Sequence, residues 1–141
     1  MKTLDAALKD LQKIVDNTDF NLPVVNGKAI RIGKVIIRQS KNLGYLIVDT
    51  ETNKTVETAF SKRGAVAIAN AYLKNLSYRS LAMQDKIIEK NVNDIVFYNN
   101  GIQKAQTISK KYLLEDRLEI AAQNIEVAKD RLDRFIFTHI R

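Results

Sequence analysis

The chain has 141 residues, of which 45% are hydrophobic, and 23 Lys and Arg residues against 16 Asp and Glu residues give a net charge of +7. This length is typical of one domain or of a small domain with an appendage, and the apolar fraction excludes global disorder. Without Cys the chain has no disulfides, thiolate zinc sites or cysteine nucleophiles, and its single His, His139, excludes most imidazole metal sites. No apolar run approaches about 18 residues, so we expect no signal peptide, no transmembrane segment, and a location in the cytoplasm or inside a host cell or virion.

The positive charge lies in the middle of the chain. Residues 31–63 and residues 64–114 each carry a net charge of +4, whereas residues 1–30 are neutral and residues 115–141 carry −1. A polyanion partner would therefore meet the middle of the chain, and the balanced C-terminus is typical of a solvated helix face.

The first segment has the apolar spacing of an amphipathic helix that begins after Thr3 and ends at residues 17–19. Pro23 prevents its continuation, and the Asn26-Gly27 pair predicts a tight turn that opens a small hairpin. The apolar face of this helix consists of Leu4, Ala7, Leu8, Leu11, Ile14 and Val15.

Three strands are predicted next, over residues 29–39, 45–50 and 55–60, and their short turns indicate an antiparallel meander. The apolar alternation of the first strand slips by one residue at Gly33, which predicts a β-bulge. On that interpretation Arg31, Lys34 and Arg38 share the face opposite the core.

Ser61 is the expected N-cap of a helix that extends to about Leu76 and packs its small residues on the sheet. One helix does not cover a three-stranded sheet, so we expect the first helix or the C-terminal part to contribute.

The remainder of the chain has helical periodicity. One helix is expected to begin at Ser80 and end at residues 99–101, where Asn-Asn-Gly is a C-cap signal. A second helix is expected over residues 102–139, with a stutter in its apolar repeat or a break near residues 113–116. Its apolar residues follow a 3.5-residue repeat that continues to His139 and is typical of a coiled-coil seam. The seam closes an intramolecular hairpin or mediates self-association, and it consists of Leu114, Leu118, Ala121, Ile125, Ala128, Leu132 and Phe135.

The sequence therefore predicts an α+β fold. An N-terminal helix, a three-stranded antiparallel meander and a packed helix form a small module over residues 1–78. A long-helix hairpin or coiled coil follows over residues 79–141.

Two groups of cations are candidate phosphate contacts. Lys62 and Arg63 lie in the first turn of a helix, where cations oppose the helix dipole unless an anion binds there. The Arg31, Lys34 and Arg38 row would track a phosphate backbone, with Lys41 at the following turn. The alternatives are a solvated cation pair and charge that protects an edge strand from aggregation. The full candidate set is Arg31, Lys34, Arg38, Lys41, Lys62 and Arg63.

The helix–strand–strand–strand–helix order over residues 3–77 resembles that of double-stranded RNA-binding domains. In that family, basic residues at the start of the last helix bind phosphates across a groove, and Lys62 and Arg63 match that position. The resemblance is one of topology: Val66 stands where a third cation is expected, and residues 40–44 keep only Lys41 of the family's basic turn.

No catalytic constellation, metal site or cofactor motif is recognisable. The glycines are wrongly spaced for a phosphate loop, and Asp49, Glu51 and Glu57 are interpreted as polar residues of a strand and turn. We therefore expect a non-enzymatic interaction or assembly protein that binds a protein partner or a second copy, with no membrane or small-molecule partner. The Lys-, Asn- and Ile-rich composition is typical of AT-rich genomes such as those of many bacteriophages, which favours a virion or accessory component. The alternative is a nucleic-acid-binding protein that contacts phosphates through the six cations above.

Overall fold

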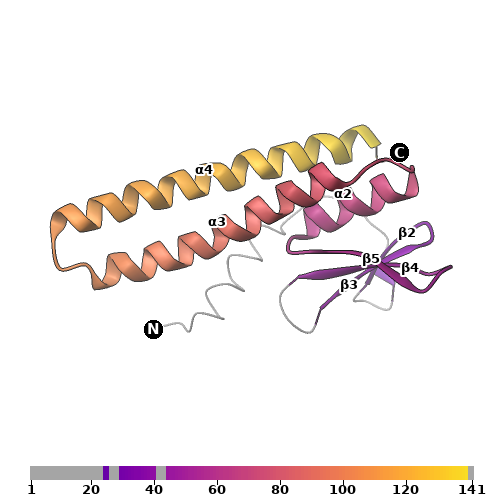
Figure 1. The fold of residues 1–141 in the computed structure, drawn as a ribbon, viewed down its shortest axis with the longest axis horizontal. Helices are drawn as coiled ribbons and strands as arrows, with labels where there is room; N and C mark the ends of the chain where they lie inside the picture. Colours follow the sequence, from indigo (N-terminus) through magenta and orange to yellow (C-terminus); the bar gives the residue numbers. More distant parts are fainter. Residues whose placement is uncertain (1–23, 26–28, 41–43, 140–141) are drawn as a thin grey trace.

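A computed structural model of the chain describes residues 24–25, 29–40 and 44–139. The predicted N-terminal helix, the Asn26-Gly27 turn and Lys41 lie outside these residues. The described chain is an α+β arrangement in which a small antiparallel sheet and a short helix lie at one end of a long helical hairpin (Figure 1).

The sheet is a sequential meander of β2 (Ala29–Ile32), β3 (Val35–Gln39), β4 (Tyr45–Asp49) and β5 (Lys54–Ala59). The two-residue β1 (Val24–Val25) pairs with β2 at the edge, as expected for a small hairpin there. The expectation of three strands was wrong because residues 29–39 do not form one bulged strand. Ile32 pairs with Val35, so Gly33 and Lys34 form a two-residue hairpin turn. Gly33 has a φ of 57°, a conformation that glycine adopts without strain and that such turns require.

The strand register separates the two faces of the sheet. Val35, Ile37 and Ile47 are fully or almost fully buried on the inner face. Arg31 and Arg38 lie on the outer face, where Arg31 pairs with Ile36 across the strands. The irregularity in the sheet lies between Ile47 and Val48, opposite β5, and not at Gly33.

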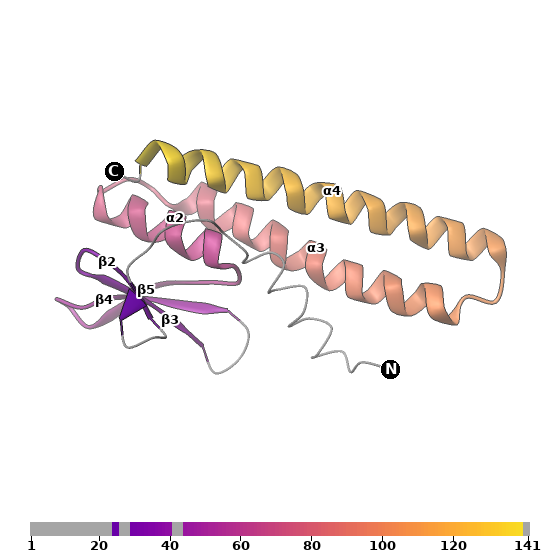
Figure 2. The same cartoon turned by 180° about the vertical axis from the view of Figure 1, so that it is seen from behind.

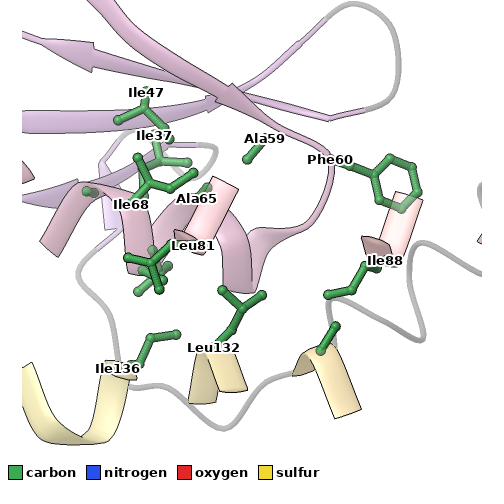
Figure 3. Packing of buried hydrophobic residues seen from close by; sticks show 14 of the residues in the cluster. Ile37, Ile47, Ala59, Phe60, Ala65, Ile68, Leu81, Ile88, Leu132 and Ile136 are labelled. Atoms are coloured by element: carbon green, nitrogen blue, oxygen red, sulfur yellow. The ribbon is translucent and has the colours of Figure 1, made fainter. Parts of the chain in front are cut away.

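Helix α2 (Lys62–Leu73) packs on the inner face of the sheet and ends three residues before the predicted Leu76. The N-cap residue of α2 is Ser61, as predicted. Its hydroxyl accepts a hydrogen bond from the backbone N–H of Gly64 at 3.0 Å. Ala65 and Ile68 project between the sheet and the hairpin, beside Ile37 and Ile47 (Figure 3).

Helices α3 (Arg79–Lys104) and α4 (Ile108–His139) form an antiparallel hairpin, and its connecting loop lies at the end away from the sheet in both views (Figures 1 and 2). The predicted helix end at residues 99–101 was wrong, because α3 continues to Lys104. Residues 113–116 lie within α4, so the helix is not broken there, and the alternative of a stutter in the apolar repeat stays a prediction. A side chain at Gly101 would come within 3.1 Å of Leu114, so this glycine permits close helix packing and is not a C-cap.

The predicted seam packs inside the chain against α3 and α2, with Leu118 partly buried and its other residues up to Leu132 buried. The seam differs from the prediction at its C-terminal end. Ile136 is fully buried in place of Phe135, which is partly buried and stacks on His139 with ring centroids 4.2 Å apart. The step from Leu132 to Ile136 follows the 3.6-residue period of a straight helix. A single cluster of buried residues joins the sheet to all three helices, with Leu132 and Ile136 facing Leu81 (Figure 3).

Candidate interaction surface

The start of α2, one of the predicted phosphate sites, already holds a carboxylate of this chain. Asp85 of α3 is buried and accepts hydrogen bonds from the backbone N–H groups of Phe60 and Ser61 at 2.7 and 2.9 Å and from the Ser61 hydroxyl at 2.6 Å. A Cβ at Gly64 would collide with the same carboxylate. Burial raises the pKa of Asp85, while the hydrogen bonds from Ser61 and Phe60 oppose that shift.

Arg63, the second cation at this helix start, faces α4. Its Nε donates to Asp133 Oδ1 at 2.9 Å, and the Arg63 side chain is only 11% exposed. Lys62 is half-buried and also has an interaction partner. Arg63 therefore connects α2 to α4 of the hairpin through its ion pair with Asp133.

Lys34 belongs to a polar cluster at the other end of α2. Its Nζ lies 3.6 Å from Asp49 Oδ2 and 3.6 Å from Glu51 Oε2. Asp49 is buried and accepts a hydrogen bond of 2.5 Å from the Tyr72 hydroxyl. This hydrogen bond is the main reason that the pKa of Asp49 is lowered, and Asp49 in turn raises the pKa of Lys34. The cluster fixes the end of the sheet to α2.

The candidate phosphate contacts do not form one surface. Arg31 and Arg38 lie exposed on the outer face of the sheet, whereas Lys34 turns toward α2. Lys62 and Arg63 lie at the start of α2, roughly 15 Å along its axis from Tyr72 at about 1.5 Å per residue. Among the candidates that the structure describes, Arg31 and Arg38 are the two that share an exposed face, which an extended polyanion would contact.

Another surface lies on the hairpin. The Arg131 side chain donates to Gln84 at 3.4 Å, and the Asn124 amide donates to Asn91 at 3.2 Å. Seven residues separate these contacts on each helix, so α3 and α4 keep a constant register. Asp85 binds the start of α2, and Asp94 lies nine residues later, which places it about half a turn around α3 from Asp85 at about 100° per residue. The side of the hairpin that carries Asp94 therefore points away from the start of α2, and we call it the rear face.

A groove of about 240 Å³ runs between α3 and α4 on the rear face. The Asn91–Asn124 hydrogen bond lies along it. Asp94 and Arg117 line the groove, and neither has an ion pair or hydrogen bond within the described residues. The groove is lined by Lys90, Asn91, Asp94, Tyr98, Arg117, Ile120, Ala121 and Asn124.

An apolar row follows the edge of this groove on α4. Leu113, Ile120 and Val127 are 51%, 56% and 52% exposed and recur every seven residues. Met83, which is 57% exposed, and the partly buried Ile87 lie one heptad before groove residues of α3. Several large exposed apolar side chains on one face of a molecule mark interaction sites more often than single ones do.

Sequence reasoning missed this row. The buried heptad seam on α4 begins at Leu114, and the exposed row begins one residue earlier with the same period. A helix that carries two adjacent heptad rows has a wider apolar face than one partner helix covers, and that signal was present in the sequence.

A second recess, of about 320 Å³, lies beside Asp85 and is lined by Tyr45, Thr58, Lys86 and Glu89 among others. Three hydrogen bonds already satisfy the Asp85 carboxylate there. The described residues contain no cluster of three metal-ligating side chains. Within the same part of the chain, no helix combines the length and the apolar character needed to cross a membrane.

The chain matches no protein-family model, no curated protein and no solved structure.

Proposed function

We propose that the chain is a non-enzymatic interaction protein whose hairpin binds a protein partner through its rear face. The observation that carries this proposal is the exposed row of Leu113, Ile120 and Val127 beside a groove that contains the unpaired Asp94 and Arg117. Apolar residues flanked by polar groups that lack partners are typical of protein interfaces.

The buried carboxylates support a structural role for the rest of the molecule. Asp85 and Asp49 are both satisfied by groups of this chain: Asp49 joins the sheet to α2, and Asp85 joins the start of α2 to α3. Such clusters keep the sheet and α2 in a fixed position at one end of the hairpin.

The proposal is tested with a pair of matched variants in α4, Ile120→Asp on the rear face and Ile108→Asp near the loop. Both isoleucines are more than half exposed, so neither substitution should unfold the chain. A tagged chain in an extract of its source cells should retain specific proteins that Ile120→Asp loses and Ile108→Asp keeps, as quantified by mass spectrometry. Identical bound proteins for all three chains would contradict the proposal.

The second candidate is nucleic-acid binding by the outer face of the sheet. It is favoured by Arg31 and Arg38, which share that exposed face and have no ion pair within the described residues. Binding to duplex RNA or DNA should then weaken steeply with salt and weaken further in Arg31→Ala/Arg38→Ala. Lys104→Ala, in an exposed residue near the hairpin loop, is the control. No binding at about 50 mM salt would exclude this candidate.

A further inference from the structure

We infer that the rear face binds a second copy of this chain, and that the two hairpins together form a four-helix bundle. The inference rests on the proposed function, because it names the partner for the same face. It differs from the self-association expected from the sequence, since the buried seam of Leu114, Ile125 and Leu132 stays inside each copy.

We place a two-fold axis between two copies, parallel to the helices of the hairpin. Such an axis turns the rear faces of two copies toward each other and places α3 of one copy over α4 of the other. Every neighbouring pair of helices is then antiparallel, which is the arrangement of up-and-down bundles. The contact is isologous, so a single self-complementary face is sufficient.

The apolar side chains of the two helices complement each other under this symmetry. Gln84 is level with Arg131 and Asn91 with Asn124, and the symmetry keeps these levels. Ile87 of one copy is therefore almost level with Val127 of the other, and Met83 lies about 7 Å further along the helix axis, at about 1.5 Å per residue. Tyr98 lies opposite the interval between Leu113 and Ile120. The exposed row on α4 meets the apolar residues on α3 in both halves of the interface.

The unpaired charges point to a second copy in preference to a partner of uniform charge. The groove carries both signs, Asp94 on α3 and Arg117 on α4. In the bundle the levels of Asp94 of one copy and Arg117 of the other differ by about one helical turn along the axis, an offset that a long arginine side chain can span. The symmetry forms this pair twice.

The rear face is also of a suitable size. Helix α3 has 26 residues and is thus about 39 Å long, and two helices at a spacing of about 10 Å present a width of roughly 20 Å. The resulting area is close to the approximately 800 Å² that each partner buries in a standard interface.

Light scattering on the purified chain is the first test. The wild type should have twice the 16.0 kDa mass of the chain. Ile120→Asp should reduce the mass to that of one chain, while Ile108→Asp should leave it unchanged, because it lies about a third of a turn around α4 from Ile120. Circular dichroism and thermal unfolding confirm that both variants fold. A wild type that is monomeric at about 100 µM would overturn the inference.

Mixing two charge variants is the second test. Asp94→Arg and Arg117→Asp should each dimerise at least ten-fold more weakly than the wild type, since each homodimer opposes like charges twice. A mixture of the two should form heterodimers with near wild-type affinity, because both interchain pairs are then of opposite sign. A role within one chain would give no rescue on mixing, and that result would overturn the inference.

The outcomes separate this inference from the proposed function. If the wild type is monomeric and binds an extract protein that Ile120→Asp does not bind, the inference of a second copy is rejected and the proposed interaction surface is supported. A dimer that is unaffected by Ile120→Asp would reject this face for self-association. Binding of nucleic acid that Ile120→Asp leaves intact would assign that activity to another surface.

Discussion

The module of sheet and α2 differs from the hairpin in how its charged groups are satisfied. Arg63 and Lys34 of the module are paired, and Asp49 of the sheet and Asp85 of α3, which contacts the module, each accept several hydrogen bonds. On the rear face of the hairpin, Asp94 and Arg117 have no such partners within the described residues.

This difference separates residues that hold the fold together from residues that are available for binding. A buried charge without a partner is costly, so the module needs its pairs in order to fold. On the rear face Asp94 is partly buried and Arg117 is exposed, so water solvates both charges, and substitutions of these residues should alter interactions with little effect on stability.

The largest expected effect compares two leucines of α4. Leu132→Ala removes a fully buried side chain from the core and should lower the free energy of unfolding by about 2–5 kcal/mol. Leu113→Ala, the same substitution at a half-exposed position, should cost less than about 1 kcal/mol. Urea denaturation under conditions where the chain is monomeric measures both. Similar losses would show that the rear face contributes to folding.

The next effect concerns the carboxylate at the start of α2. In the wild type, backbone N–H groups donate to both oxygens of the Asp85 carboxylate. Asp85→Asn keeps the volume but replaces one of these oxygens with an NH2 group, which cannot accept a hydrogen bond. We expect a loss of about 1–3 kcal/mol, the cost of a buried donor without an acceptor. Asp94→Asn, on the rear face, is the control and should change stability by less than about 0.5 kcal/mol. If Asp85→Asn is neutral, the carboxylate is not required to join α3 to α2.

The two buried carboxylates should give pH dependences of opposite sign. The pKa of Asp49 is lowered, so its contribution to stability is present above its ordinary value of 3.8 and is lost as the pH falls through the lower folded-state pKa. The pKa of Asp85 is raised, so stability is greatest below 3.8 and decreases as the pH rises through the higher folded-state pKa.

Denaturation of the wild type and of each Asp→Asn variant across this pH range measures the two contributions. The stability of the wild type should rise with pH relative to Asp49→Asn and fall with pH relative to Asp85→Asn. Equal slopes for the two variants would contradict the opposite shifts.

Sequence patterns predicted the elements whose cause is local. The period-two strands, the Ser61 cap and the heptad seam follow from residue spacing, and the α+β order is confirmed. The number of strands was wrong because Gly33 is compatible with either a bulge or a turn, and only pairing with β3 decides between them.

Long-range contacts explain the other differences. Gly101 has the local features of a helix C-cap, but it lies inside α3 because Leu114 packs against it. Asp85 and Asp133 become partners of Ser61 and Arg63 only after the hairpin folds back, across 24 and 70 residues of sequence. The candidate phosphate site at α2 could not be assessed without those contacts.

The smallest expected effects compare two aspartates of α4 that are three residues apart. Asp133 pairs with Arg63 of α2, whose side chain is largely buried, whereas Asp130 pairs with Arg134 on the helix surface at 3.0 Å. Asp133→Asn should lower the free energy of unfolding by about 1–2 kcal/mol, because Arg63 keeps its charge in a poorly solvated position. Asp130→Asn should cost less than about 0.5 kcal/mol, and that loss should disappear at high salt. A loss for Asp133→Asn that salt also removes would mean that Arg63 can reach water and that the tie between α2 and the hairpin is weaker than its geometry implies.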